Sequence, residues 1–188
     1  MITIVTGMTR CGSSLMMRCL HRGGVPVYAS NTTSYEHDDM LTLPQHTAWL
    51  DRCQGHAVKV LDAHRYRLPP GRAYRTILLT RNPDEQAKSI VKFTRLLKLA
   101  DIPDTAIPQL ALSLREDLPR LQAAMCALGP VLQLTFEDLV TLPHSTLQQV
   151  NTFCEDALDL QAMRTAIIPR SPLCYPGLLE LQERQEVR

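Results

Sequence analysis

The fold is decided by the stretch Ile2-Thr3-Ile4-Val5-Thr6-Gly7-Met8-Thr9-Arg10-Cys11-Gly12-Ser13-Ser14. The β-branched run at residues 2–6, followed at once by a glycine, predicts a buried strand that ends in a turn. Apolar residues recur at helical spacing from Ser13 to Leu20, and Gly23-Gly24 ends that helix. Between strand and helix, the spacing of Gly7 and Gly12 is that of a Walker A loop, whose backbone N–H groups surround a phosphate.

The segment Gly7–Ser14, called here the phosphate loop, lacks the Walker lysine, because Ser13 stands in its place. An ordinary ATPase or kinase needs that lysine on the β- and γ-phosphates. The only cation within the loop is Arg10. A simple strand-to-helix turn is the interpretation without function, since this glycine spacing alone is weak evidence.

The rest of the chain continues the alternation of strands and helices. Further strands are expected at residues 57–61, 75–80 and 131–135, and helices at 47–53, 83–99, 107–128, 144–154 and 158–167. This order predicts βαβ units, and therefore a P-loop NTPase-like α/β fold with three layers, α/β/α, around a parallel sheet of about four to five strands. No repeat or linker divides the chain, so residues 1–188 are expected to form one domain.

Composition excludes several classes of function. The chain has 188 residues and a net charge of +1, which argues against a nucleic-acid partner because such binding usually needs a strong positive field. No apolar run approaches the roughly 20 residues of a membrane span. Six scattered cysteines without zinc spacing, and an opening without the features of a signal peptide, predict a cytoplasmic protein with no metal site.

Residues 7–15 resemble the 5′-phosphosulfate loop of the sulfotransferases that use 3′-phosphoadenosine-5′-phosphosulfate (PAPS), including bacterial sulfotransferase-like proteins. That loop typically has the sequence Gly-x-Pro-Arg/Lys-Ser-Gly-Thr-Ser/Thr, and here a threonine replaces the proline and a cysteine the first serine. The resemblance implies that the 5′-phosphosulfate is bound by six consecutive residues, namely Thr9, Arg10, Cys11, Gly12, Ser13 and Ser14.

A second motif follows the strand at 75–80. Arg81 stands at the strand end and Ser89 lies eight positions later, which resembles the Arg-Asp/Asn-Pro-x5-Ser signature with which sulfotransferases bind the 3′-phosphate of the donor. Independently of the family, an arginine at the carboxyl end of a parallel strand faces the region where such sheets bind ligands, and its planar guanidinium suits a phosphate. The nonfunctional interpretation is a surface arginine paired with Asp84 or Glu85.

The resemblance extends more loosely to residues 23–27, 57–61 and 134–139, and so covers about residues 2–154. The basic Arg-Lys-Gly loop that the family carries near its C-terminus has no clear counterpart. Arg164 and Arg170 are the nearest basic candidates.

The resemblance implies transfer of a sulfuryl group from PAPS to a hydroxyl or amine of a small-molecule or peptide acceptor, with release of 3′-phosphoadenosine-5′-phosphate (PAP). Arg10 and Lys59 would stabilise charge, with no metal required, and Glu36 would be the base that takes the acceptor proton. Other candidates for the base are His37, Asp62 and His64. Two alternatives stay open: a divergent P-loop kinase, and a non-catalytic nucleotide-binding module on the same fold.

Overall fold

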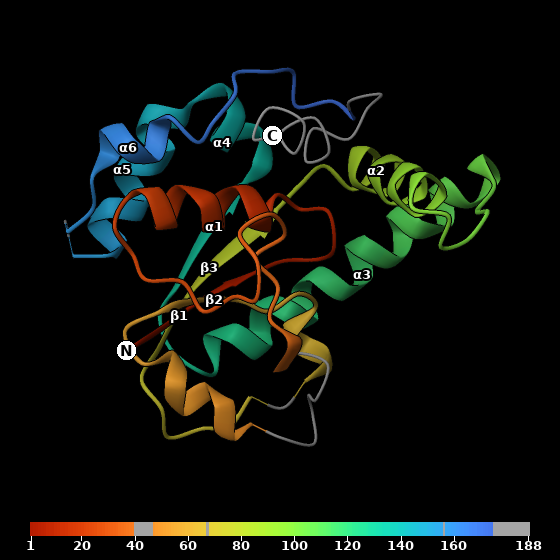
Figure 1. The fold of residues 1–188 in the computed structure, drawn as a ribbon. Helices are drawn as coiled ribbons and strands as arrows, with labels where there is room; N and C mark the ends of the chain where they lie inside the picture. The colour runs from red at the N-terminus through yellow and green to blue at the C-terminus, as the bar shows by residue number, and fades with distance from the viewer. Residues whose placement is uncertain (40–46, 67, 156, 175–188) are drawn as a thin grey trace.

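A computed structural model describes residues 1–39, 47–66, 68–155 and 157–174. Its centre is a parallel sheet of four strands in the order β2-β1-β3-β4 (Figure 1). The strands are β1 (Ile2–Thr6), β2 (Ala57–Lys59), β3 (Tyr74–Thr80) and β4 (Val131–Thr135). The expected α/β class with an all-parallel central sheet is therefore confirmed, with a strand number at the lower end of the predicted range.

The helices lie close to the predicted places, except that α6 covers only the middle of the expected range 158–167. They are α1 (Ser13–Arg22), η2 (Ala48–Cys53), η3 (Ala63–Arg65), α2 (Pro83–Leu96), η4 (Asp104–Ala106), α3 (Ile107–Cys126), α4 (Phe136–Thr141), α5 (Pro143–Phe153) and α6 (Leu160–Arg164). Two differences have local causes. Helix α2 ends three residues before the expected position because Lys98 has a left-handed φ of 55°. Helix α4 was not expected, and it starts where the Thr135 side chain accepts a hydrogen bond from Asp138 N.

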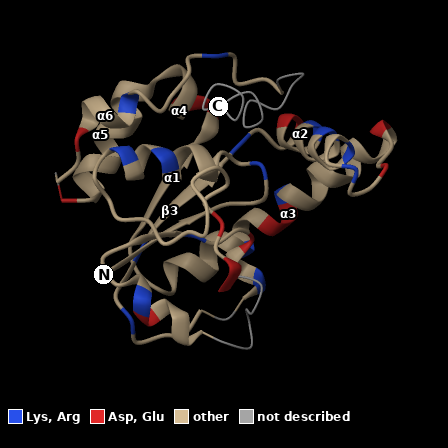
Figure 2. Cartoon of the chain, in the orientation of Figure 1, with Lys and Arg blue, Asp and Glu red and all other residues tan. Residues whose placement is uncertain are grey.

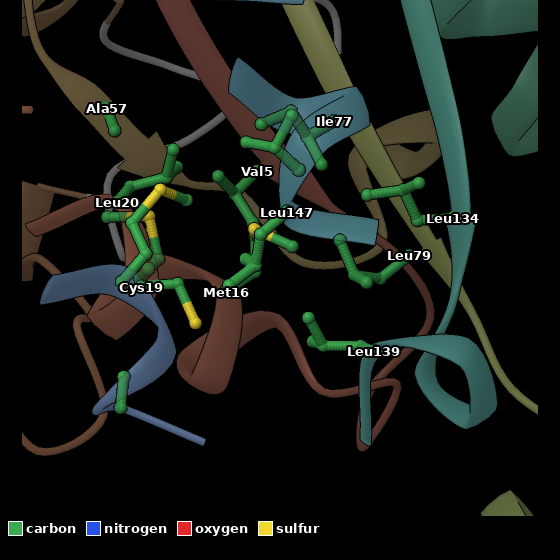
Figure 3. Packing of buried hydrophobic residues seen from close by; sticks show 14 of the residues in the cluster. Val5, Met16, Cys19, Leu20, Ala57, Ile77, Leu79, Leu134, Leu139 and Leu147 are labelled. Carbon is green, nitrogen blue, oxygen red and sulfur yellow. The ribbon is translucent and has the colours of Figure 1, made fainter. Parts of the chain in front are cut away.

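Alternate residues of the strands point to opposite faces of the sheet. Val5, Ile77 and Leu79 pack with buried residues of α1, α4, α5 and α6 on one face, and Figure 3 shows the side chains of this cluster. Ile4 and Leu78 pack on the other face, where η2, α2 and α3 supply the partners. Helices therefore cover both faces of the sheet, as three layers require (Figure 1).

The parallel strands bring their carboxyl ends to one edge of the sheet. The phosphate loop and Arg81 follow strand ends there, and Lys59 is the last residue of β2. A Cβ at Gly7 would lie 2.3 Å from the carbonyl oxygen of Leu79, so the loop passes β3 closely enough to require glycine. In Figure 2, basic positions lie on the loop before α1 and on the segment that joins β3 to α2. Within the described ranges, no helix is both long and apolar enough to cross a membrane.

Candidate functional site

The phosphate loop turns directly from β1 into the first turn of α1. Gly12 is the N-cap of α1 with a φ of 98°, and among the described residues it receives no side-chain cap. No acidic residue occupies the first turn of this helix. The N–H groups and the positive end of the helix dipole at this point are of the kind that suit an anion.

Hydrogen bonds from outside the loop hold its backbone. Four consecutive carbonyl oxygens accept them: Gly7 O from Asp62 N (3.1 Å), Met8 O and Thr9 O from Gln86 Nε2 (3.0 and 2.8 Å), and Arg10 O from Arg81 Nη1 (3.3 Å). Within this restrained segment, Arg10 adopts a left-handed φ of 67°. For a residue other than glycine, this conformation costs on the order of 1–3 kcal/mol. Neighbouring elements therefore impose the loop conformation, rather than the local sequence alone.

Cys11, predicted as a cofactor contact, has its side chain inside the protein. Burial raises the pKa of its thiol to about 11, although hydrogen bonds from the backbone and side chain of Ser13 oppose the shift. Ser13 is itself buried. Since both side chains face each other beneath the loop, these two residues can serve a ligand through their backbone only.

Arg10 joins the two motifs that the sequence predicted separately. Its Nε donates to Ser89 Oγ at 3.3 Å, and its guanidinium lies 4.5 Å from the centroid of the Phe93 ring. Ser89 is buried on α2, so its hydroxyl is part of the wall of the site rather than a solvated surface group. Ser89 is therefore not a solvent-exposed helical serine.

Arg81 lies between the phosphate loop and the C-terminal segment. Its Nη1 donates to Arg10 O at 3.3 Å and its Nη2 to Pro172 O at 3.2 Å, while its Cζ lies 4.4 Å above the Phe136 ring. Its Nε is buried without a hydrogen-bond partner in the described part of the chain. Removal from water lowers the pKa of the guanidinium, which means that its positive charge lacks full compensation. An anionic ligand group would supply that compensation.

Arg170, near the end of the described chain, lies against the same aromatic ring as Arg81. Its Cζ lies 5.6 Å from the Phe136 ring, the ring that Arg81 also contacts. Arg164, the other basic candidate, is exposed at the end of α6. The structure therefore separates two candidates that the sequence left equivalent.

Lys59 places a second cation at the first turn of α1. Its buried Nζ donates to Ser14 Oγ (3.2 Å), to Ser34 O (2.6 Å) and to Glu36 Oε1 (2.9 Å). Burial lowers the pKa of Lys59, and the Glu36 carboxylate acts in the opposite direction. The Glu36 side chain keeps 57% of its surface exposed, so it lies at the edge of the site and within reach of a second molecule.

The other candidates for a base lie in different surroundings. His37 stacks on Tyr28 with a centroid distance of 4.1 Å, and its Nδ1 accepts from Asp39 N. His64 points toward α3, with its Nε2 3.8 Å from an Asp117 oxygen.

Asp62 does touch the phosphate loop. Burial raises the pKa of its carboxyl group, and a hydrogen bond with the backbone of Thr9 lowers it. Of the four candidates, Glu36 and Asp62 contact residues of the site, while the two histidines are engaged elsewhere.

Gln86 was not among the site residues predicted from the sequence. Its side chain is buried on α2, and it lies three residues before Ser89, so both share one helix face. A polar pair at this spacing on the inner face of a helix that begins at a strand end is a signal that could have found it.

No family model matches the chain, and no curated protein matches it. Among the described residues, no three His, Cys, Asp or Glu side chains are grouped so that they could hold a metal ion.

Proposed function

We propose that this protein is a sulfotransferase that moves a sulfuryl group from PAPS to a hydroxyl or amine acceptor and releases PAP. One observation carries the proposal: Arg10 of the phosphate loop binds Ser89, while Arg81 binds the carbonyl of Arg10. Arg10 and Ser89 are 79 residues apart in the sequence. The two motifs that resemble 5′-phosphosulfate and 3′-phosphate sites thus lie side by side.

The charges of the site support a donor with two separate anionic groups. Arg10 and Lys59 flank the N-terminus of α1, where a 5′-phosphosulfate would bind, and the Arg81 Nε without a partner suits a 3′-phosphate. Sulfuryl transfer resembles phosphoryl transfer, so donors aimed at the leaving phosphate oxygens lower the barrier. Lys59 brings a positive charge to the helix end that lacks the Walker lysine; its ammonium donates to Ser14, Ser34 and Glu36, so its effect on the leaving phosphate is electrostatic.

We assign Glu36 the role of the base that takes the proton from the acceptor. A carboxylate that is more than half exposed can approach a hydroxyl or amine and take its proton during transfer. Its ion pair with Lys59 links the base to the cation beside the leaving group. Small-molecule and peptide acceptors both satisfy this chemistry.

Calorimetric titration with PAP, ADP and ATP tests the donor site. We expect PAP to bind more tightly than ADP, and Arg81→Ala to weaken PAP binding by roughly ten- to a hundredfold, as loss of a charge-assisted contact would. Arg164→Ala removes an exposed arginine of α6 and should leave PAP affinity unchanged. If ATP bound as tightly as PAP, and Arg81→Ala did not affect it, a divergent kinase would replace this proposal.

Turnover separates an enzyme from a binding module. In a screen of labelled PAPS against hydroxyl and amine acceptors, Glu36→Gln should lower turnover by about 10²–10⁴-fold while PAP affinity is kept. Asp38→Asn, a neutralisation of an exposed acid in the same loop, is the matched control. PAP binding without transfer to any acceptor would favour the module. Full activity of Glu36→Gln would move the role of the base to Asp62.

A further inference from the structure

Gln86 has no role in the chemistry described so far, yet its amide group contacts the phosphate loop directly. The side chain is buried on α2, with 3% of its surface exposed. Its Nε2 donates to Met8 O at 3.0 Å and to Thr9 O at 2.8 Å. A primary amide has two N–H groups on one nitrogen, so a single glutamine can satisfy two neighbouring carbonyls.

We propose that Gln86 is a positioning residue, which holds the phosphate loop in the conformation that binds the anionic donor; this inference rests on the proposed function. A carbonyl oxygen carries a partial negative charge, and one turned toward the bound anion would repel it. The hydrogen bonds from Gln86 keep two such oxygens turned toward α2. They therefore act on anion affinity through the backbone of the loop, without contact to the ligand.

The conformation of Arg10 makes this restraint necessary. A left-handed φ at a residue with a side chain persists only when the surrounding structure imposes it. Gln86 holds the peptide group before Arg10 through Thr9 O, and Arg81 holds the one after it through Arg10 O. The direction of the Arg10 side chain thus depends on both.

Helix α2 supplies both parts of this arrangement. Gln86 fixes the backbone before Arg10, and Ser89, three residues further on the same helix face, accepts the hydrogen bond from Arg10 Nε. Loss of the Gln86 amide should therefore release the loop carbonyls and the guanidinium together.

The experiment compares Gln86→Met, which keeps the length of the side chain but removes its donors, with the wild-type protein. We expect affinity for PAP and for inorganic pyrophosphate, which probes the phosphate loop alone, to fall roughly ten- to thirtyfold in calorimetry. Thr146→Val is the matched control, because it removes a buried hydrogen bond on α5, to Leu142 O, away from the loop. It should lower thermal stability without changing either affinity.

A second variant, Gln86→Glu, gives a readout that a purely structural role would not move. A protonated carboxyl group can donate one hydrogen bond to a loop carbonyl, whereas an ionised one can donate none. The ratio of its PAP dissociation constant to that of the wild type should therefore decrease as the pH falls from about 8 to about 5.5. Because PAP changes its own protonation state equally in both experiments, dividing by the wild-type dissociation constant removes that contribution.

Three results would overturn the inference. Gln86→Met would bind PAP and pyrophosphate as the wild type does, or it would lose no more affinity than Thr146→Val, or the ratio of PAP dissociation constants for Gln86→Glu would not change with pH. If the wild-type protein bound neither PAP nor pyrophosphate, the proposed function would fail separately. Amide hydrogen exchange of residues 8–12 would then test whether Gln86 restrains the phosphate loop. Faster exchange in Gln86→Met than in Thr146→Val supports the restraint, and equal exchange refutes it.

Discussion

At the scale of single residues, the Cys11 thiol beneath the phosphate loop is kept uncharged. Cys11 is completely buried there, between Gly7 and the side chain of Ser13. Because burial raises the pKa of its thiol to about 11, the thiol is neutral at physiological pH. A thiolate at this position would place a negative charge directly behind an anion site, so the raised pKa and the proposed function agree.

Cys11 predicts a specific loss of stability in alkali. Below pH 9.0, the model-compound value, the thiol is protonated in both the folded and the unfolded chain. As the pH rises from there toward about 11, the unfolded chain releases the proton first, so the free energy of unfolding falls. The loss at the upper end amounts to roughly 2 kcal/mol.

Urea denaturation of the wild type and of Cys11→Ala between pH 8 and 11 measures this effect. The difference in unfolding free energy between the two proteins should shrink across that range, since only the wild type loses the Cys11 contribution. The other buried cysteines, Cys19, Cys53 and Cys154, titrate in both proteins and cancel in the difference. A constant difference would mean that the thiol ionises normally and is not enclosed beneath the loop.

At the scale of elements, α2 organises the candidate site, because it begins two residues after Arg81 and carries Gln86 and Ser89. Its start combines several strong signals: the Asn82 side chain accepts from Asp84 N (3.0 Å) and Glu85 N (3.3 Å), and Pro83 occupies the first turn. The cap fixes where the first turn lies relative to the strand end. Consequently it also fixes which residues of α2 face the phosphate loop.

Asn82→Ala should lower the free energy of unfolding by about 1 kcal/mol, the usual cost of losing an N-cap side chain. It should also weaken PAP binding several-fold, because fraying of the first turn moves Gln86. Asn82→Asp keeps the acceptor and should preserve both quantities. Urea denaturation and calorimetry on the three proteins check this. If stability fell while PAP affinity stayed constant, the start of α2 would not control the site.

At the scale of the whole molecule, the segment after α6 crosses to α2, a course that Figure 1 shows in blue. It is attached there by the hydrogen bond from Arg81 to Pro172 O and by one from Cys174 N to Glu85 Oε2, at 2.7 Å. Arg170 lies on the same segment, against the Phe136 ring. Arg10 of the phosphate loop and Pro172 near the end of the described chain thus both contact Arg81.

This arrangement predicts that Arg170 contributes to binding of the 3′-phosphate. Arg170→Ala should weaken PAP roughly three- to tenfold, less than Arg81→Ala, because a partly exposed cation is screened by solvent and salt. The effect should diminish with added salt and should be absent for ADP, which has no 3′-phosphate. Calorimetry at two salt concentrations tests it. An equal effect of Arg164→Ala would indicate general charge attraction rather than a site.

Local sequence determined the elements and the residues placed at their ends. The β-branched run at residues 2–6, the glycines at 7 and 12, and the Asn-Pro-Asp-Glu start of α2 are signals within a few residues of one another. Arg10 and Arg81 could be predicted as site residues because each lies shortly after a strand, and parallel strands bring those ends together. Lys59 was predicted from the resemblance to sulfotransferases.

The tertiary structure alone decided the remaining contacts. The contacts of Gln86 and Arg170, and the inward orientation of Cys11, depend on which helix face turns toward the sheet and on which strands are neighbours. The order β2-β1-β3-β4 brings Lys59 and Arg81 to opposite sides of the phosphate loop. These partners are separated by tens of residues, and a hydrogen bond at 3 Å is set by packing of the whole core rather than by any local pattern.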